Sequence, residues 1–163
     1  MNLVEVVNGT RVALGDEAVA RLVARVLEAE GVRGAEVAVA FVGERRIRTL
    51  NAEHRGRDEV TDVLSFPLEE AGEAAAGAAT QTVLPGAPHP PRLLGDIVVC
   101  ARQALRQARA DSLPPAFELA VLLAHGTLHL LGYDHEVDAG RMALRQAEVL
   151  ELVDWEALVV PPR

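Results

Sequence analysis

The chain of 163 residues has a single cysteine, no lysine and no long apolar run. One cysteine excludes an internal disulfide and a cysteine-rich zinc cluster, and Cys100, at the end of an apolar run, is expected to be a small buried thiol. The missing apolar run excludes a transmembrane helix. The first residues lack the basic start and hydrophobic stretch of a signal peptide. We therefore expect a cytoplasmic protein that does not contact a membrane.

Basic residues are fewer than acidic residues, so the formal net charge is −8 at pH 7. This charge argues against a general affinity for nucleic acids, because nonspecific binding depends mainly on neutralising phosphates. The arginines are unevenly distributed, however, and one group lies between Arg45 and Arg57. For most of these arginines a solvated helix face is the simpler interpretation.

Three of the five histidines lie within residues 125–135. His125 and His129 are four residues apart, so on a helix their rings project from the same face. Gly132 follows at a position where a left-handed residue would end the helix and turn the chain back. His135 would then join the first two histidines. The spacing predicts a three-histidine metal site that leaves the fourth tetrahedral position of a zinc ion open to water or substrate.

The same spacing is found in the metzincin zinc proteases, whose first histidine is followed by a glutamate. Here Gly126 stands in place of that glutamate. Peptide hydrolysis by the usual route is therefore not expected, because the general base is missing. A single histidine on an apolar helix is more often a hydrogen-bonded core residue than a ligand. Two such histidines, with a third in register, favour a metal.

Hydrophobic periodicity predicts one mixed α/β (α+β) domain over residues 1–163, with a small mixed sheet of about four strands covered by helices and the histidine helix at its centre. Strands are expected at residues 3–7, 36–42, 60–66 and 94–100, and helices at residues 16–30, 44–54, 101–110, 116–131 and 137–153. Residues 69–92 are rich in Ala, Gly and Pro and predict an exposed, flexible loop, which contains His89. We assign no role to His89. Trp155 is expected to close the core.

Three blocks of sequence, in order, resemble the YbeY family of bacterial metal-dependent endoribonucleases of ribosomal RNA maturation. The blocks are residues 50–67 (LNAEHRGRDEVTDVLSFP), 94–98 (LGDIV) and 125–135 (HGTLHLLGYDH). The last block has every fixed residue of the family pattern His-Gly-x-Leu-His-Leu-x-Gly-Tyr-Asp-His. The resemblance covers nearly the whole chain. It departs at His54, where the family usually has an aromatic residue, and at Val60, where it has a proline.

The resemblance implies that His125, His129 and His135 hold one zinc ion, and that Arg55 acts on RNA beside it. It also implies an endoribonuclease specific for single strands, which acts in 16S rRNA 3′-end processing and ribosome quality control. The implied partners are single-stranded ribosomal RNA, small-subunit ribosomal proteins and an assembly GTPase.

The expected chemistry is the cleavage of a phosphodiester bond. Zinc would polarise a non-bridging oxygen and lower the pKa of its bound water to about 7, which makes the missing glutamate tolerable. Arg55 would offset the charge of the transition state. Attack by the 2′-hydroxyl of the RNA is the competing route, and the sequence does not choose between them. Two other classes stay open: a metallohydrolase acting on peptides or small molecules, and a ribosome-assembly factor with a structural zinc.

Several polar residues near these blocks have simpler interpretations. Turn or strand-end hydrogen bonds are expected for Asp62, Ser65 and Asp96. Asp134 could bond a ligating imidazole or serve only as a turn residue. Tyr133 is expected to pack against the last helix rather than stack on a base, and His54 to be a surface helix residue.

Overall fold

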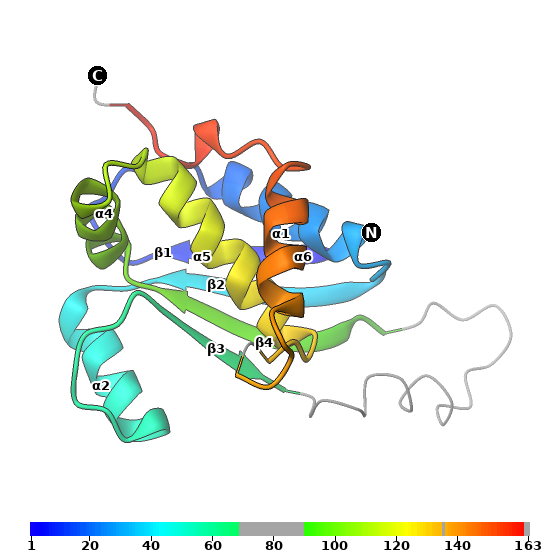
Figure 1. Cartoon of the computed structure of the whole chain (residues 1–163), viewed down its shortest axis with the longest axis horizontal. Coiled ribbons are helices and arrows are strands. Elements are labelled where there is room, and N and C mark those ends of the chain that lie inside the picture. The colour runs from blue at the N-terminus through cyan, green and yellow to red at the C-terminus, as the bar shows by residue number, and fades with distance from the viewer. Residues whose placement is uncertain (69–89, 135, 162–163) are drawn as a thin grey trace, which may run out of the picture.

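The computed structural model of the chain describes residues 1–68, 90–134 and 136–161, in which helices pack on a small sheet (Figure 1). The elements in chain order are β1 (Leu3–Asn8), α1 (Asp16–Ala29), β2 (Ala35–Phe41), α2 (Glu44–Arg55), β3 (Val63–Pro67), β4 (Arg92–Val99), α4 (Ala101–Ala110), α5 (Pro115–Leu130), α6 (Arg141–Leu150) and the 3₁₀ turn η2 (Glu156–Leu158).

The four strands form one mixed sheet in the order β1-β2-β4-β3. Strands β1, β2 and β4 are parallel, and β3 is antiparallel to β4. The expected small mixed sheet of four strands is therefore confirmed. Strand β3 lies at one edge of this sheet, where it pairs only with β4 among the described residues.

Helices cover the two faces of the sheet unequally (Figure 1). Helices α1 and α5 pack on one face, and α1 buries the apolar stripe that its periodicity predicts: Val19, Leu22, Val23, Val26 and Leu27. Helix α2 lies against the opposite face, where Ile47 packs on Leu64 of β3 and Val98 of β4. The C-terminal end of α2 is thereby held beside the β3 edge.

Helix α5 is the central helix of the described structure. It contacts α1, α4, α6, β3 and β4, and its buried residues lie on almost all sides. Pro115 occupies the first helical turn, where a missing amide donor costs little. The histidines of α5 therefore lie partly within the protein interior, where polar groups need hydrogen-bonding or metal partners.

Two predicted elements begin later than expected because side chains bind the backbone ahead of them. The strand expected from residue 60 begins at Val63, whose N–H donates to Oδ1 of Asp62 at 2.8 Å. The helix expected from residue 137 begins at Arg141, because the Asp138 carboxylate accepts the N–H groups of Gly140 and Met142 and stabilises a turn before the helix.

The loop expected over residues 69–92 lies largely outside the described residues, as does His89. Its predicted end is wrong, since β4 already begins at Arg92. The N–H of Arg92 donates to the Gly34 carbonyl at 2.9 Å, and Arg92 is paired with Ala35 of β2. Pairing with β2 thus extends the strand beyond the apolar residues that define it in the sequence.

The pairing of β2 with β4 is interrupted by a shift of register between Glu36 and Val37, opposite Leu93 and Gly95. Gly95 has a φ of +135°, and a Cβ atom there would lie 2.2 Å from the Phe66 carbonyl oxygen of β3. Only glycine combines this backbone conformation with such a close approach of the neighbouring strand.

Two expectations for single residues are confirmed. Cys100 is a buried free thiol, and burial raises its pKa. Trp155 packs on the main core and contacts the Phe117 ring edge to face at a centroid distance of 5.4 Å. Among the described residues, no helix combines the length and apolar character needed to cross a membrane.

Replacing Gly95 by alanine should destabilise the fold by several kcal/mol, because the new Cβ would collide with the β3 backbone in a strained conformation. Gly34→Ala is the matched control: its φ is +67°, but no atom lies within 4 Å of the added Cβ. Strain alone should cost the control about 1 kcal/mol. Urea unfolding measures both changes, and equal losses would contradict the role of close approach.

Candidate metal centre

His125 and His129 lie side by side on α5. Their ring centroids are 4.6 Å apart, with an angle of 78° between the ring planes. Both rings line the same surface cleft. This closeness follows from the helical repeat, which places residues four apart on one face. The two histidines therefore place two imidazole rings side by side at the cleft.

The chain turns back sharply directly after α5. Gly132 has a φ of +95°. Its N–H donates to the His129 carbonyl at 3.0 Å, and the N–H of Tyr133 donates to the Leu128 carbonyl at 3.1 Å. These bonds form a Schellman motif, which needs a left-handed residue and here uses a glycine. The turn that the sequence predicts at Gly132 is present.

His135 lies outside the described residues, so its place as a third ligand stays a prediction. Without it, the described part of the chain contains no group of three or more His, Cys, Asp or Glu residues that could hold a metal ion. Asp134 accepts a hydrogen bond from the Glu136 N–H at 3.0 Å, which is the turn role that the sequence allows.

Gln146 of α6 is a hydrogen-bond partner of His125. Nδ1 of His125 lies 3.0 Å from Oε1 of Gln146. Oε1 of Gln146 can accept a proton from Nδ1, and in that arrangement the lone pair of the imidazole is on Nε2. Metal-binding histidines are usually oriented by such a partner. Gln146 was not predicted from the sequence, because no motif links α6 to α5.

Gly126, which replaces the metzincin glutamate, is required by packing. A Cβ atom at this position would lie 2.8 Å from Cγ2 of Ile97 and 3.2 Å from Oγ of Ser65. The Ser65 hydroxyl donates to the Gly126 carbonyl at 3.2 Å, which joins β3 to α5. A side chain here would force Ile97 or the helix to shift, which disfavours a carboxylate base at this position.

The cleft in front of the histidines has a volume of about 800 Å³. It runs from the end of α2, along the following loop and the whole of β3, to α5. Its lining residues are Asn51, His54, Arg55, Arg57, Glu59, Thr61, Asp62, Val63, Leu64, Ser65, Phe66, Pro67, His125, His129 and Glu136. The structure thus brings Arg55 into the same cleft as two of the three predicted ligands.

Arg55 is the last residue of α2, and Gly56, with a φ of +68°, ends the helix. The loop that follows is held to α2 by the buried Asn51, whose amide donates to the Glu59 carbonyl at 3.0 Å. Arg57, which the sequence indicates only as a member of an arginine group, also lines the cleft. Two guanidinium groups therefore border it, which suits an anionic substrate.

His54 is exposed, as expected for a surface helix residue. Its ring also contacts the Phe66 ring edge to face at a centroid distance of 4.9 Å and lines the cleft. In the sequence, the only indication that His54 lies at the cleft is its position next to Arg55.

Acidic groups make the charge of the cleft mixed. Glu59, Asp62 and Glu136 line it. Glu118 lies on α5, two turns before His125, and burial raises the pKa of its carboxyl group, with a further contribution from the negative charge of Asp62. Asp96 is exposed on β4 and is not a lining residue. The positive charge of the cleft comes from Arg55 and Arg57, which lie at its α2 end, whereas acidic side chains line other parts of it.

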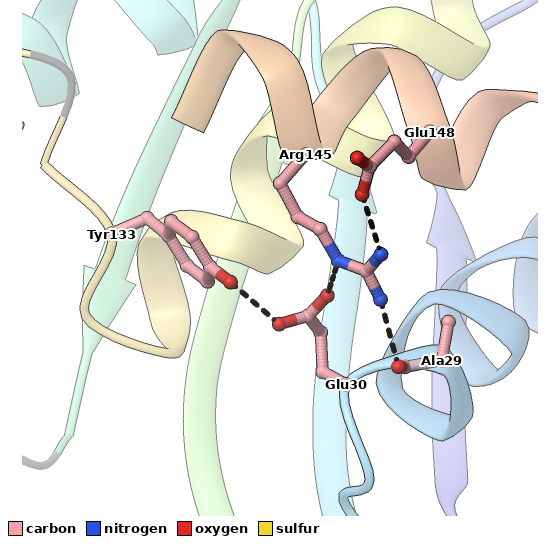
Figure 2. A network of polar contacts seen from close by, with 5 residues as sticks. All are labelled: Ala29, Glu30, Tyr133, Arg145 and Glu148. Atoms are coloured by element: carbon pink, nitrogen blue, oxygen red, sulfur yellow. Dashed lines mark hydrogen bonds and ion pairs between the residues drawn. The ribbon is translucent and has the colours of Figure 1, made fainter. Parts of the chain in front are cut away.

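A polar network fixes the turn after α5 to the rest of the protein (Figure 2). The Tyr133 hydroxyl donates to Oε2 of Glu30, the residue that follows α1, at 2.8 Å. Arg145 of α6 binds the other oxygen of Glu30 and donates to Glu148 and to the Ala29 carbonyl, each at 2.8 Å. Burial, followed by the bond to Glu30, raises the pKa of Tyr133. Tyr133 thus anchors the turn to the end of α1.

The fold and the cleft define an α/β protein with a histidine pair on a central helix beside a sheet edge. The family model described as Endoribonuclease YbeY matches residues 7–154 of the chain. The chain therefore belongs to the YbeY family.

Individual relatives and one solved structure agree with this assignment. Endoribonuclease YbeY of Macrococcus caseolyticus is 45% identical over 80% of this chain and 80% of its own length. That of an Anaeromyxobacter species is 46% identical over 77% of this chain, but the chain spans only 58% of that relative's length. The solution structure of TM1509 from Thermotoga maritima has a TM-score of 0.59 and 28% identity, and the similarity covers 91% of this chain and 87% of the other.

Removing Arg145 should destabilise the protein by about 2 kcal/mol, because Glu30 would lose a charged partner in a largely buried network. Arg25→Ala is the matched control, since Arg25 also pairs with a glutamate three residues away, at 3.5 Å, but on the surface. The control should change stability by no more than about 0.5 kcal/mol. Urea unfolding of Arg145→Ala and Arg25→Ala tests this, and similar values for the two variants would exclude a special role for the network.

Proposed function

We propose that this chain is a metal-dependent endoribonuclease that cleaves single-stranded RNA. The main support for the proposal is that His125, His129 and Arg55 line the same cleft of about 800 Å³. The names of the YbeY relatives supply the reaction class. Ribosomal RNA as the substrate, with processing of the 16S 3′ end, rests on the family resemblance.

The residues present fit a zinc ion. Two imidazoles lie side by side, and the hydrogen bond between Nδ1 of His125 and Gln146 suits metal binding through Nε2. His135 would complete three nitrogen ligands, a set found in catalytic zinc sites. A zinc ion held there would supply a Lewis acid for a phosphate oxygen.

The side chains of the cleft would bind and orient the RNA. Arg55 and Arg57 would pair with phosphate oxygens, for which a planar guanidinium offers two parallel donors. Arg55 would also offset the negative charge on the phosphoryl oxygens in the transition state. The attacking group is either water or the 2′-hydroxyl of the RNA, and the second route leaves a cyclic phosphate.

Hydrolysis of peptides is a poorer fit. The position of the general base in related zinc sites is held by Gly126, where a side chain would collide with Ile97. In addition, the cleft has two arginines at its α2 end, and their charge suits phosphates better than a neutral peptide. A ribosome-assembly factor with a structural zinc predicts metal binding without RNA cleavage.

We infer that partners bring the RNA to the cleft. A net charge of −8 opposes general binding to RNA, and the favourable charges are confined to a few arginines. Small-subunit ribosomal proteins and an assembly GTPase in the cytoplasm would deliver ribosomal RNA locally.

Cleavage of a defined unstructured RNA tests the proposal. Chelation should abolish cleavage and zinc should restore it. His129→Ala should lose both zinc and activity. Arg55→Ala should keep zinc while kcat falls about 10²–10³-fold, as for other electrostatic stabilisers.

Arg46→Ala is the matched control for Arg55→Ala, because Arg46 is an exposed arginine of the same helix that does not line the cleft. It should cleave at the wild-type rate. Metal binding without cleavage by the wild-type protein would support the assembly-factor alternative, and metal-dependent peptidase activity would support the other.

Gln146→Leu should weaken zinc binding about 10–100-fold, because the orienting acceptor for His125 is lost. Competition with a chromophoric chelator measures the affinity. Gln146→Glu retains an acceptor and should bind zinc at least as well as Gln146→Leu. Gln107→Leu, an exposed position on α4, is the control. If zinc affinity is the same in all four proteins, Gln146 does not position a ligand.

A further inference from the structure

The edge strand β3 forms a continuous wall of the cleft. Every residue from Thr61 to Pro67 lines it. Strand β3 is at the end of the sheet order, and no described strand pairs with its outer side. An edge strand presents backbone N–H and C=O groups on that side. These backbone groups therefore face the substrate cleft.

The hydrogen bonds between β3 and β4 show which groups point outward. The N–H of Cys100 donates to the Asp62 carbonyl at 2.8 Å, and the N–H of Leu68 donates to the Leu94 carbonyl at 3.0 Å. Each pair lies directly opposite in the antiparallel register. In such a ladder, hydrogen-bonded pairs alternate along the strand. Leu64 and Phe66 therefore bond to β4, and the backbone groups of Val63, Ser65 and Pro67 point away from it.

Only one of these three outward positions offers an N–H to the cleft. The Val63 N–H already donates to the Asp62 carboxylate at 2.8 Å. Pro67 has no N–H. Within residues 1–68, 90–134 and 136–161, no strand pairs with the outer side of β3, and by the same alternation the Ser65 N–H points to that side, away from β4.

The Ser65 amide also lies next to the histidines. The Ser65 side chain points inward and donates to the Gly126 carbonyl at 3.2 Å. Gly126 directly follows His125 on α5, and its lack of a side chain permits this contact. The bond holds β3 against the helical turn that carries the histidine pair. The outward N–H is thus fixed on the cleft wall beside the candidate metal centre.

We propose that the backbone N–H of Ser65 binds a phosphate oxygen of an RNA strand that lies along β3. This inference rests on the proposed function. The non-bridging oxygens of a phosphodiester only accept hydrogen bonds, so they match this donor and the guanidinium groups of Arg55 and Arg57. A backbone donor held rigidly by a sheet and a helix is pre-oriented toward developing negative charge. It binds the phosphate irrespective of the neighbouring bases.

Amide NMR of the zinc-loaded, ¹⁵N-labelled protein tests the contact without a mutation. The probe is a single-stranded oligonucleotide with 2′-O-methyl riboses, which blocks attack by the 2′-hydroxyl. Its length is checked after the measurement, because attack by water would still cut it. The Ser65 amide proton should shift downfield and exchange more slowly with solvent. The Val63 amide is the internal control and should change little, because Asp62 already accepts its proton. An unchanged Ser65 amide in the complex overturns the proposal.

Two variants test the effect on cleavage. Ser65→Pro removes the N–H at an outward-facing edge position, where proline is tolerated. It should lower kcat about 10²–10³-fold with unchanged zinc content. Ser65→Ala keeps the N–H but loses the bond to Gly126, and should retain activity within about tenfold of wild type. Equal activity of Ser65→Pro and Ser65→Ala overturns the proposal; if Ser65→Pro does not fold, the NMR result decides.

The outcomes separate this inference from the proposed function. Cleavage by the wild-type protein with an unchanged Ser65 amide refutes the contact and leaves the endoribonuclease activity intact. If the zinc-loaded wild-type protein neither binds the oligonucleotide nor cleaves RNA, both proposals fail.

Discussion

The close packing of α5 against β3 and β4 is the constraint on which the candidate site depends. Gly126 brings the helix backbone against Ile97 and Ser65, and Gly95 brings β4 under Leu130 at the end of the same helix. Side chains at either glycine would force the helix and sheet apart. Because the contact is close, the Ser65 hydroxyl bonds the helix backbone directly, and the histidine pair lies at the sheet edge where the cleft opens.

Two further sets of contacts position the site, one at the C-terminal end of α5 and one on the other side of the sheet. At the C-terminal end of α5, the turn at Gly132 is held by Tyr133, whose hydroxyl binds the carboxylate that Arg145 also binds (Figure 2). Arg145 and Gln146 are consecutive residues of α6, so the same helix anchors the turn and orients His125. On the other side of the sheet, Ile47 packs α2 against β3 and β4, and this places Arg55 at the cleft. Separate hydrophobic clusters therefore set the positions of the arginine and the histidines.

Local patterns predicted most of the secondary structure, because they depend on residues close in sequence. The apolar stripe of α1 and the alternation of β2 both have the burial that their periods indicate. The errors lie at element ends. Asp62 and Asp138 bind nearby backbone N–H groups and delay β3 and α6, whereas pairing with Ala35 brings Arg92 into β4. Hydrophobic periodicity contains no information on these competing hydrogen bonds.

The amino-acid sequence by itself determined the histidine pair and the bend that follows it. Four residues make about one helical turn, so His125 and His129 share a face, and Gly132 accepts the left-handed conformation that closes the helix. The tertiary structure alone decided that Arg55, Ser65 and Gln146 surround this pair. Their contacts cross from α2, β3 and α6 to α5, and the relative positions of these elements are set by core packing and glycine contacts between segments far apart in the chain.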